Sequence, residues 1–481
     1  MDLLLVFKRF VANLFCLLIT CHVFSQVKVV NENISIVDEN TLIVNGKFSS
    51  GINGRTFQKD VLISHKGYQY IVYYNDERRV CISRRKLPNG KWDTITFLDY
   101  HFESNDSHNC ISMGICPNDG TIHLAFDHHV DNLHYRVSKK GLANNPETIT
   151  WDASAFGPII SELEKGKQIK ITYPKFWQTP DGNLQFNYRV RGSGNGDRML
   201  VDYNGVTGKW ENTRQIDSAE GFFKDQLGAS ESRCSYPNGY DYDNNGTLHA
   251  TWTWRENSQG ANHDLIYVYS EDNGNSWKNN SGKLLEDIPH VNSPDIVVQS
   301  IPRVLGLMND QGQTIDSKNR VHVVIYHSTE QTITEAGSFL GETRWGPNEA
   351  KRYHHYWRDI TANWHHFEMN LKVGNRPKVF VDKYDNLIMI YAGNTQGDKK
   401  NYDQNKRDLI IATASAKNKW KDWSIAHVVK GPFINDMLGD FYRWKDEAIL
   451  SIMVQNVPKR KRKRSTLKVV DLTFEYKLKN N

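Results

Sequence analysis

Alternating apolar and polar positions recur along this chain of 481 residues, each time after a turn that ends in Gly or Asn. A polar or aromatic group stands at the far end of each apolar stretch. Period-2 alternation of Val, Ile, Tyr, Phe and Trp between Asn, Asp and Gly turns predicts β-strands. The clearest copies are DGTIHLAFDHH from Asp119, DGNLQFNYRVR from Asp181, NNGTLHATWTWRE from Asn244 and KNRVHVVIYHS from Lys318.

Weaker copies begin at Lys66, Asp385 and Asp446, which brings the number to seven, spaced roughly 53 to 73 residues apart. A repeat that covers almost the whole chain favours one large domain over several small ones. Seven units of about four strands each predict an all-β fold, a seven-bladed β-propeller, because radial repetition protects the sheet edges. We expect the segment from Val27 to Phe48 and the C-terminal LKVVDLTFEYKL to pair and close the ring.

Residues 1–25 have the pattern of a secretory signal peptide, in which Lys8 and Arg9 precede an apolar run too short for a membrane span. We expect cleavage near Ser25, leaving residues 26–481 as a single catalytic domain; a lipidated Cys21 is the alternative. The mature protein is therefore expected to be secreted, either extracellular or periplasmic, with no membrane span. Its four remaining cysteines are too few for a disulfide framework, and their pairing cannot be deduced.

The formal net charge of +5 is compatible with a polyanionic substrate and identifies no partner. The basic run PKRKRKRS from Pro458 resembles a nucleic-acid or nuclear-localisation motif. A secretory leader argues against both functions, so we interpret the run as a solvated hairpin loop. We expect no nucleic-acid partner and a monomer.

His, Arg and aromatic residues gather at the ends of the repeat strands. If these strands are the innermost ones of their blades, their ends meet on one face and form a polar pocket that recognises an anion. For any single residue, a hydrogen-bonded role in the channel is the alternative. His108 and Tyr173 precede two of the strands in the same way, so both are expected near the channel in adjacent blades. The strand ends are Asp127–His129, Arg189–Arg191, Thr253–Arg255 and Tyr326–Ser328.

These segments together resemble the BNR-type propeller ulvan lyases, most closely polysaccharide lyase family 25, with family 24 the near relative. The resemblance spans roughly residues 60 to 460. It implies an endo-acting enzyme that cleaves ulvan, a sulfated algal polysaccharide of rhamnose 3-sulfate and uronic acid, by β-elimination to unsaturated oligosaccharides. The motifs that carry it are HN at His108, GICPNDGTIHLAFDHHVDNLHYR, TYPKFW, NYRVRGSG, SRCSYPNGYDYDNNGTLHATWTWRE and NHDLIYVYSEDNGNSW.

Carried over by motif, the resemblance implies that Tyr173 and His108 are catalytic and that His128, Arg189 and Tyr236 bind the uronate. Tyr240 stands four residues after Tyr236 and is the alternative for that position. The candidates for binding sulfate are Lys175, Arg191, Arg233 and Arg255, and solvated surface charge is the other interpretation of these residues.

β-Elimination removes the C5 proton of a uronate and expels the C4 oxygen, so the enolate-like charge needs cations or hydrogen-bond donors. Arg189 and a histidine supply them. Tyr173 could act as base and acid if nearby positive charge lowers its pKa from about 10 towards the working pH. His108 would then neutralise the carboxylate, or replace Tyr173 as the base.

The chemistry needs no cofactor. A structural Zn or Ca ion is a further expectation from the resemblance, with Cys234, His263 and His327 as candidate ligands, although no close C-x-x-C or H-x-x-x-H spacing supports it. Two rival functions remain: a sialidase-like glycoside hydrolase on the same fold, and a carbohydrate-binding propeller without activity. The hydrolase would need paired carboxylates or an arginine triad around a nucleophilic tyrosine, and the strand ends offer Asp127 as the obvious carboxylate.

Overall fold

The structure is a computed structural model that describes residues 27–44, 46, 51–58, 60–257, 261–341, 345–394, 407–459 and 463–476. The signal peptide expected at residues 1–25 lies outside these ranges, as does the centre of the basic run that begins at Pro458. No helix within the described ranges is long and apolar enough to cross a membrane.

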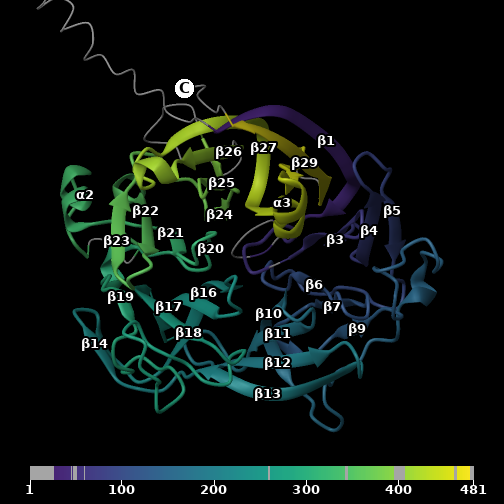
Figure 1. Ribbon diagram of the computed structural model, residues 1–481, viewed down its shortest axis with the longest axis horizontal. Coiled ribbons are helices and arrows are strands. Elements are labelled where there is room, and N and C mark those ends of the chain that lie inside the picture. The colour runs from purple at the N-terminus through teal and green to yellow at the C-terminus, as the bar shows by residue number, and fades with distance from the viewer. Residues whose placement is uncertain are drawn as a thin grey trace, which may run out of the picture.

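The strands form sheets arranged around a central axis, and the chain passes from one sheet to the next round the ring (Figure 1). The predicted all-β architecture is confirmed. The first sheet contains β2 (Leu62–His65), β3 (Tyr68–Tyr74), β4 (Val80–Lys86) and β5 (Asp93–Thr96), and the second contains β6 (Ile111–Ile115), β7 (Ile122–Phe126) and β9 (Tyr135–Val137). The third sheet contains β8 (His129–Asn132), β10 (Lys170–Gln178), β11 (Leu184–Arg189), β12 (Arg198–Asn204) and β13 (Lys209–Asp217). The fourth contains β16 (Arg233–Tyr242), β17 (Leu248–Glu256), β18 (Asn262–Ser270) and β19 (Val297–Gln299), and the fifth contains β20 (Gly312–Ile315), β21 (Val321–His327), β22 (Arg352–Arg358) and β23 (Trp364–Glu368).

The last sheet is larger and brings the two ends of the described chain together. Its seven strands run in the order β1 (Val27–Leu42), β29 (Arg464–Tyr476), β28 (Ile449–Asn456), β27 (Ser424–Gly439), β26 (Arg407–Ala414), β25 (Leu387–Gly393) and β24 (Lys378–Val381). A small hairpin, β14 (Phe223–Asp225) with β15 (Gly228–Ser230), stands outside these sheets, and two short helices, α2 (Glu330–Glu335) and α3 (Phe441–Glu447), interrupt the strands.

All seven repeat segments form strands, but they are not the innermost ones. The strand nearest the axis is the one that precedes each repeat strand, and β6, β10, β16, β20 and β24 lie towards the centre of the ring (Figure 1). β2 contacts β6, and β27 contacts β24. Two of the inner strands were missed because their alternation is broken. Both β10 and β16 contain a proline and a shift of register, between Thr172 and Lys175 in β10 and between Pro237 and Gly239 in β16.

The hydrophobic core lies between neighbouring sheets. Ile71 of β3 and Leu124 of β7 belong to one buried cluster, and Trp177 of β10 and Trp252 of β17 belong to another. The turns before the repeat strands use the backbone freedom of glycine, with Gly120 at φ = 66° and Gly182 at φ = 81°. Before β28 this turn is replaced by α3, which ends at Ala448 in a left-handed conformation.

The first and last strands of the described chain close the ring. As predicted, β1 pairs antiparallel with β29, from Val27 opposite Tyr476 to Leu42 opposite Arg464. This pairing gives the final sheet its outer strand from the other end of the chain, so the sheets cannot separate without breaking it.

Asp471 of β29 connects the closing sheet to the first sheet. Its carboxylate accepts hydrogen bonds from Arg85 Nη2 of β4 at 2.7 and 2.9 Å, from Arg443 Nη1 of α3 at 2.8 Å and from Ser451 Oγ at 2.7 Å. The side chains of Arg85, Arg443 and Asp471 are almost completely buried. Removing one member of such a network leaves the others charged and desolvated.

We predict that Asp471→Asn lowers the free energy of unfolding by about 3–5 kcal/mol, because two buried guanidinium groups lose their shared carboxylate. Chemical denaturation followed by tryptophan fluorescence measures the loss. Glu147→Gln is the matched control, because it breaks the solvent-exposed ion pair with Lys86 and should leave the unfolding midpoint unchanged. Equal midpoints for Asp471→Asn and wild type would show that this network does not stabilise the closed ring.

Candidate active site

Tyr173 occupies a strained position at the break in β10. Between Thr172 and Lys175 the pairing with β11 shifts, and Tyr173 adopts φ = 53° just before Pro174. The left-handed region costs a residue with a side chain roughly 1–2 kcal/mol. The ring stacks on Phe57, with centroids 4.2 Å apart. Strain that the surrounding structure maintains in this way is typical of functional sites.

Arg189, the last residue of β11, is buried between two tyrosines. Its Cζ lies 5.0 Å from the ring centroid of Tyr173 and 5.6 Å from that of Tyr236 on β16. Nη1 donates to Cys234 Sγ at 3.5 Å, while Nε and Nη2 have no hydrogen-bond partner in the described part of the protein. Arginine stays protonated in proteins. The site therefore contains a buried positive charge that no carboxylate contacts among the described residues.

Arg255 and Trp345 extend this aromatic and cationic cluster. Arg255 Nη1 lies 3.4 Å from the Tyr236 hydroxyl, and its Cζ lies 5.6 Å from the Tyr236 ring. The same guanidinium lies 5.9 Å from the ring of Trp345, which is 36% exposed. Arg255 thus connects the buried Arg189–Tyr236 pair to an aromatic side chain at the surface.

Also near Tyr173, Asp106 holds two histidines. One carboxylate oxygen of Asp106 contacts His108 Nδ1, and the other lies 2.7 Å from His129 Nδ1. The two imidazole rings stack with centroids 4.7 Å apart, and they lie 6.1 and 5.8 Å from the ring of Tyr173. The side chains of Asp106, His108 and His129 are partly exposed.

Burial and the environment set the protonation states of the two candidate catalytic groups. Burial, reinforced by Tyr236, raises the pKa of Tyr173 well above its usual value, although Arg189 and Arg255 oppose the shift. Burial also lowers the pKa of His108, against the opposing hydrogen bond to Asp106. The expected lowering of the Tyr173 pKa by nearby cations is therefore wrong for this structure, because desolvation outweighs their attraction. At neutral pH Tyr173 carries its proton and His108 is an uncharged base.

The structure brings together five of the predicted site residues: His108, Tyr173, Arg189, Tyr236 and Arg255. Tyr240 lies elsewhere, stacked on Trp177 at 4.9 Å, so Tyr236 is the tyrosine of this cluster. His128 is fully buried, and its Nε2 accepts the backbone N–H of His134 at 2.8 Å. The neighbouring His129 turns towards Tyr173 in its place.

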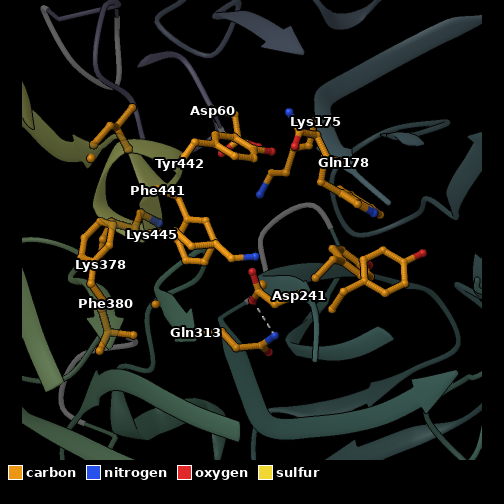
Figure 2. Close-up of a pocket in the computed structure, with 18 of the residues that line it drawn as sticks. Asp60, Lys175, Gln178, Asp241, Gln313, Lys378, Phe380, Phe441, Tyr442 and Lys445 are labelled. Atoms are coloured by element: carbon orange, nitrogen blue, oxygen red, sulfur yellow. Dashed lines mark hydrogen bonds between the residues drawn. The ribbon is translucent and has the colours of Figure 1, made fainter. Parts of the chain in front are cut away.

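Lys175 faces a different part of the central channel. Its ammonium forms a buried ion pair with Asp310 at 2.6 Å, and the side chain lines a cavity of about 640 Å³. Figure 2 shows Lys175 projecting into this cavity together with Asp60, Asp241 and Tyr442. Tyr173, His108 and Arg189 are not among the residues that line it.

The candidate metal ligands are not brought together. Cys234 contacts Arg189, His263 is held by Glu256 and Asp264 at 2.9 Å each, and both ring nitrogens of His327 are engaged, by the Ser328 carbonyl and the Tyr356 hydroxyl. These residues therefore do not fit a shared Zn or Ca site. Cys81, Cys110, Cys116 and Cys234 are all buried free thiols.

Sequence reasoning did not select three residues that contact the site, Phe57, Asp106 and Trp345, and it included His129 in a strand end without giving it a role. For Asp106 and His129 there was a local signal, since the carboxylate stands two residues before His108 and His129 is the last residue of the DHH strand end. No motif marked Phe57 or Trp345, which reach the site from irregular segments.

Comparison with known proteins agrees with this architecture. Residues 68–372, more than half of the chain, match the family described as BNR repeat-containing family members. This chain belongs to the BNR repeat-containing family. The match includes the four clearest repeat segments, which begin at Asp119, Asp181, Asn244 and Lys318.

Curated relatives of this BNR-repeat protein are ulvan lyases. It is 26% identical over 322 residues to the long isoform of ulvan lyase from Alteromonas sp. (strain LOR), covering 58% of this chain and 30% of that protein. The long isoform from Pseudoalteromonas sp. (strain PLSV) has the same identity and coverage. The short isoform from Alteromonas sp. (strain LOR) is 26% identical over 339 residues, covering 57% of this chain and 58% of that protein. The chain thus spans less than a third of the long isoforms.

Two solved structures share the fold of this BNR-repeat protein over nearly its whole length. Polysaccharide lyase Uly1 has a TM-score of 0.71 at 16% identity, covering 93% of this chain and 99% of that one. A family 25 ulvan lyase bound to -[GlcA(1-4)Rha3S]- has a TM-score of 0.64 at 11% identity, covering 91% of this chain and 95% of that one. The similarity to ulvan lyases, first visible in the motifs, is confirmed, and the fold is propeller-like.

We predict opposite stability effects for two buried arginines. Arg189→Met should leave the free energy of unfolding unchanged or raise it by about 1–4 kcal/mol, because it removes a buried charge that no carboxylate contacts. Arg233→Met should lower it by about 3–5 kcal/mol, because Arg233 Nε binds Glu256 at 2.8 Å with both side chains fully buried. Urea denaturation of both variants measures the difference. Strong destabilisation by Arg189→Met would show that this cation supports the fold.

Proposed function

We propose that this protein is a secreted, endo-acting lyase that cleaves ulvan at uronic acid residues by β-elimination and acts as a monomer. The ulvan lyase relatives support the substrate class, and the paired acid and base of the site support the reaction class. A propeller with this cluster on one face gives a long polymer access without threading a chain end.

We also propose that the ring has seven blades. The first five sheets supply one blade each. The seven-stranded sheet supplies two, because β27 pairs with β26 from Ser424 to Phe433 and with β28 from Phe433 to Gly439. The last of these blades receives β1 as its outer strand.

The observation that carries the proposal is the proximity of a neutral imidazole, a protonated phenol and a buried cation that no carboxylate contacts among the described residues. The His108 and Tyr173 ring centroids lie 6.1 Å apart, and Arg189 Cζ lies 5.0 Å from the Tyr173 ring. β-Elimination from a uronate needs these elements: a base for the C5 proton, an acid for the C4 oxygen and positive charge for the developing enolate.

In the proposed reaction His108 is the base and Tyr173 is the acid. The His108 imidazole takes the C5 proton, and the electron pair of that bond is delocalised into the adjacent carboxylate. The pair then forms the C4–C5 double bond as the C4–oxygen bond breaks. Tyr173 gives its phenolic proton to the leaving oxygen, and solvent returns a proton from the imidazolium to the tyrosinate. This assignment reverses the notion of Tyr173 as the base, because its raised pKa keeps the proton on the phenol.

The arginines stabilise the anionic stages of this reaction. Arg189 and Arg255 lie close to Tyr173 and Tyr236, so the tyrosinate forms in a positive field that needs no reorganisation. Arg255 and the exposed Trp345 offer a saccharide a cation for carboxylate or sulfate and an aromatic face for stacking.

We assign to His129 the uronate contact expected of His128, because His128 is fully buried. Lys175, paired with Asp310, supports the channel instead.

A glycoside hydrolase would need two carboxylates flanking the scissile bond. Both oxygens of Asp106, the carboxylate of this cluster, are engaged by histidines, which favours elimination.

A binding protein without activity remains the second alternative. Incubation of the protein with ulvan separates the three functions. Ultraviolet absorbance from the unsaturated product indicates a lyase, reducing ends without absorbance indicate a hydrolase, and neither signal would contradict the proposal.

We predict that Tyr173→Phe lowers kcat on ulvan by on the order of 10²–10⁴-fold, because the leaving oxygen loses its proton donor. The folded structure should persist, since the ring keeps its stacking on Phe57. Initial rates of ultraviolet absorbance measure the effect. Tyr240→Phe is the matched control, because Tyr240 is a buried tyrosine directly after the register shift of β16, and it should retain wild-type activity. Full activity of Tyr173→Phe would overturn the assignment of the acid.

We predict a pH profile of kcat/KM with its acidic limb below the usual histidine pKa of about 6.5 and its alkaline limb above the usual tyrosine pKa of about 10. The signs follow from the site: burial lowers the pKa of His108, which must be uncharged to accept a proton, and raises the pKa of Tyr173, which must be protonated to donate one. Rates measured across this pH range test the prediction. Activity that rises only above neutral pH, as a tyrosine loses its proton, would instead point to Tyr173 acting as the base.

A further inference from the structure

The Asp106 carboxylate is shared by two imidazoles from different segments. His108 follows it by two residues, while His129 begins β8. Both histidines present Nδ1 to Asp106, one to each carboxylate oxygen, and the backbone N–H of His108 also donates to Oδ1 at 3.0 Å. The ligand-type atoms of these three residues lie within 4.8 Å of one another.

This geometry determines the tautomer of both histidines. Burial opposes ionisation of Asp106, but the hydrogen bonds from His108 and His129 outweigh it and hold the pKa of this carboxyl well below its usual value. An ionised carboxylate can only accept hydrogen bonds. Each Nδ1 must therefore carry a hydrogen, so each neutral imidazole has its lone pair on Nε2, at the far side of the ring.

The stacking of the two rings limits how many protons they can hold. With centroids 4.7 Å apart, two imidazolium ions would repel each other, and one carboxylate compensates only one positive charge. Among the described residues, Arg55, whose charge disfavours a second proton, and the rings of Phe57 and Tyr173 also face His108. The set can therefore stabilise one imidazolium at a time.

We propose that Asp106 is a positioning residue that holds His108 and His129 as a pair of Nδ1–H imidazoles, one of which accepts the substrate proton while Asp106 balances the resulting charge. This inference rests on the proposed lyase reaction. The proton moves from C5 of the uronate to Nε2 of His108, and the Nδ1–H bond to Asp106 stays in place. His129, stacked on His108, keeps the ring in orientation.

Asp106→Asn tests the proposal, since an asparagine can accept from one histidine but offers an N–H to the other. We expect kcat on ulvan to fall by on the order of 10²–10⁴-fold with KM changed less than about 3-fold. We also expect the acidic limb of the pH profile to move to lower pH, because the residual base loses the charge that raises its pKa. Glu103→Gln is the matched control, because Glu103 binds the exposed His101 Nδ1 at 2.7 Å in the same kind of pair; it should behave as wild type.

Nitrogen-15 spectra of the histidine side chains give a second measurement that does not depend on activity. Wild-type protein should show Nδ1–H tautomers for His108 and His129, identified by comparison with His108→Gln and His129→Gln. Asp106→Asn should convert one of them to the Nε2–H tautomer. An Nε2–H tautomer of both residues in wild type, or a stoichiometric divalent metal detected on the pair, would overturn the proposal. If wild type does not cleave ulvan but shows the expected tautomers, the proposed function fails while the positioning by Asp106 stands.

Discussion

Closure of the ring is the constraint on which the rest of this structure depends. The pairing of β1 with β29 joins the two ends of the described chain, and Asp471 ties that closing sheet to Arg85 of the first one. Each sheet buries its faces against two neighbours, so an open ring would expose a hydrophobic face at either end. Closure also brings the inner strands to the axis. Tyr173 of β10 and Tyr236 of β16 come from adjacent sheets, and they approach each other only because the ring holds those sheets side by side.

The candidate site contains a buried charge and a strained backbone conformation that the fold itself does not require. Arg189 is buried without a contacting carboxylate, and Tyr173 sits at a positive φ. Both features cost stability, and both are maintained by packing on the surrounding sheets. Two other buried arginines are paired with carboxylates, Arg233 with Glu256 and Arg85 with Asp471. Buried Arg198 donates instead to the Asn187 amide oxygen at 2.8 Å. What distinguishes Arg189 is its position between Tyr173 and Tyr236, beside the histidine pair.

Much of the architecture could be predicted from the sequence, because strand alternation and turn residues are local signals. The seven repeat strands and the closing pair were found this way. The inner strands were not, since Pro174 and Pro237 and the adjacent register shifts break the alternation that marks a strand. For the site, the resemblance to ulvan lyases selected His108, Tyr173, Arg189 and Tyr236, which the structure brings together. It selected His128 instead of His129, because two adjacent histidines at a strand end cannot be told apart until the backbone turns one inward and the other outward.

The sequence by itself determined the all-β repeat, the closing strands and the residue types available for chemistry, because periodicity and motif spacing depend on neighbours along the chain. Tertiary structure alone decided the protonation states and the partners. Desolvation raises the pKa of Tyr173 despite two nearby arginines, and Asp106 meets His129 across a gap of more than twenty residues. Both effects depend on which side chains surround a group in space and on how much water those side chains exclude. Neither can be inferred from the order of the residues alone.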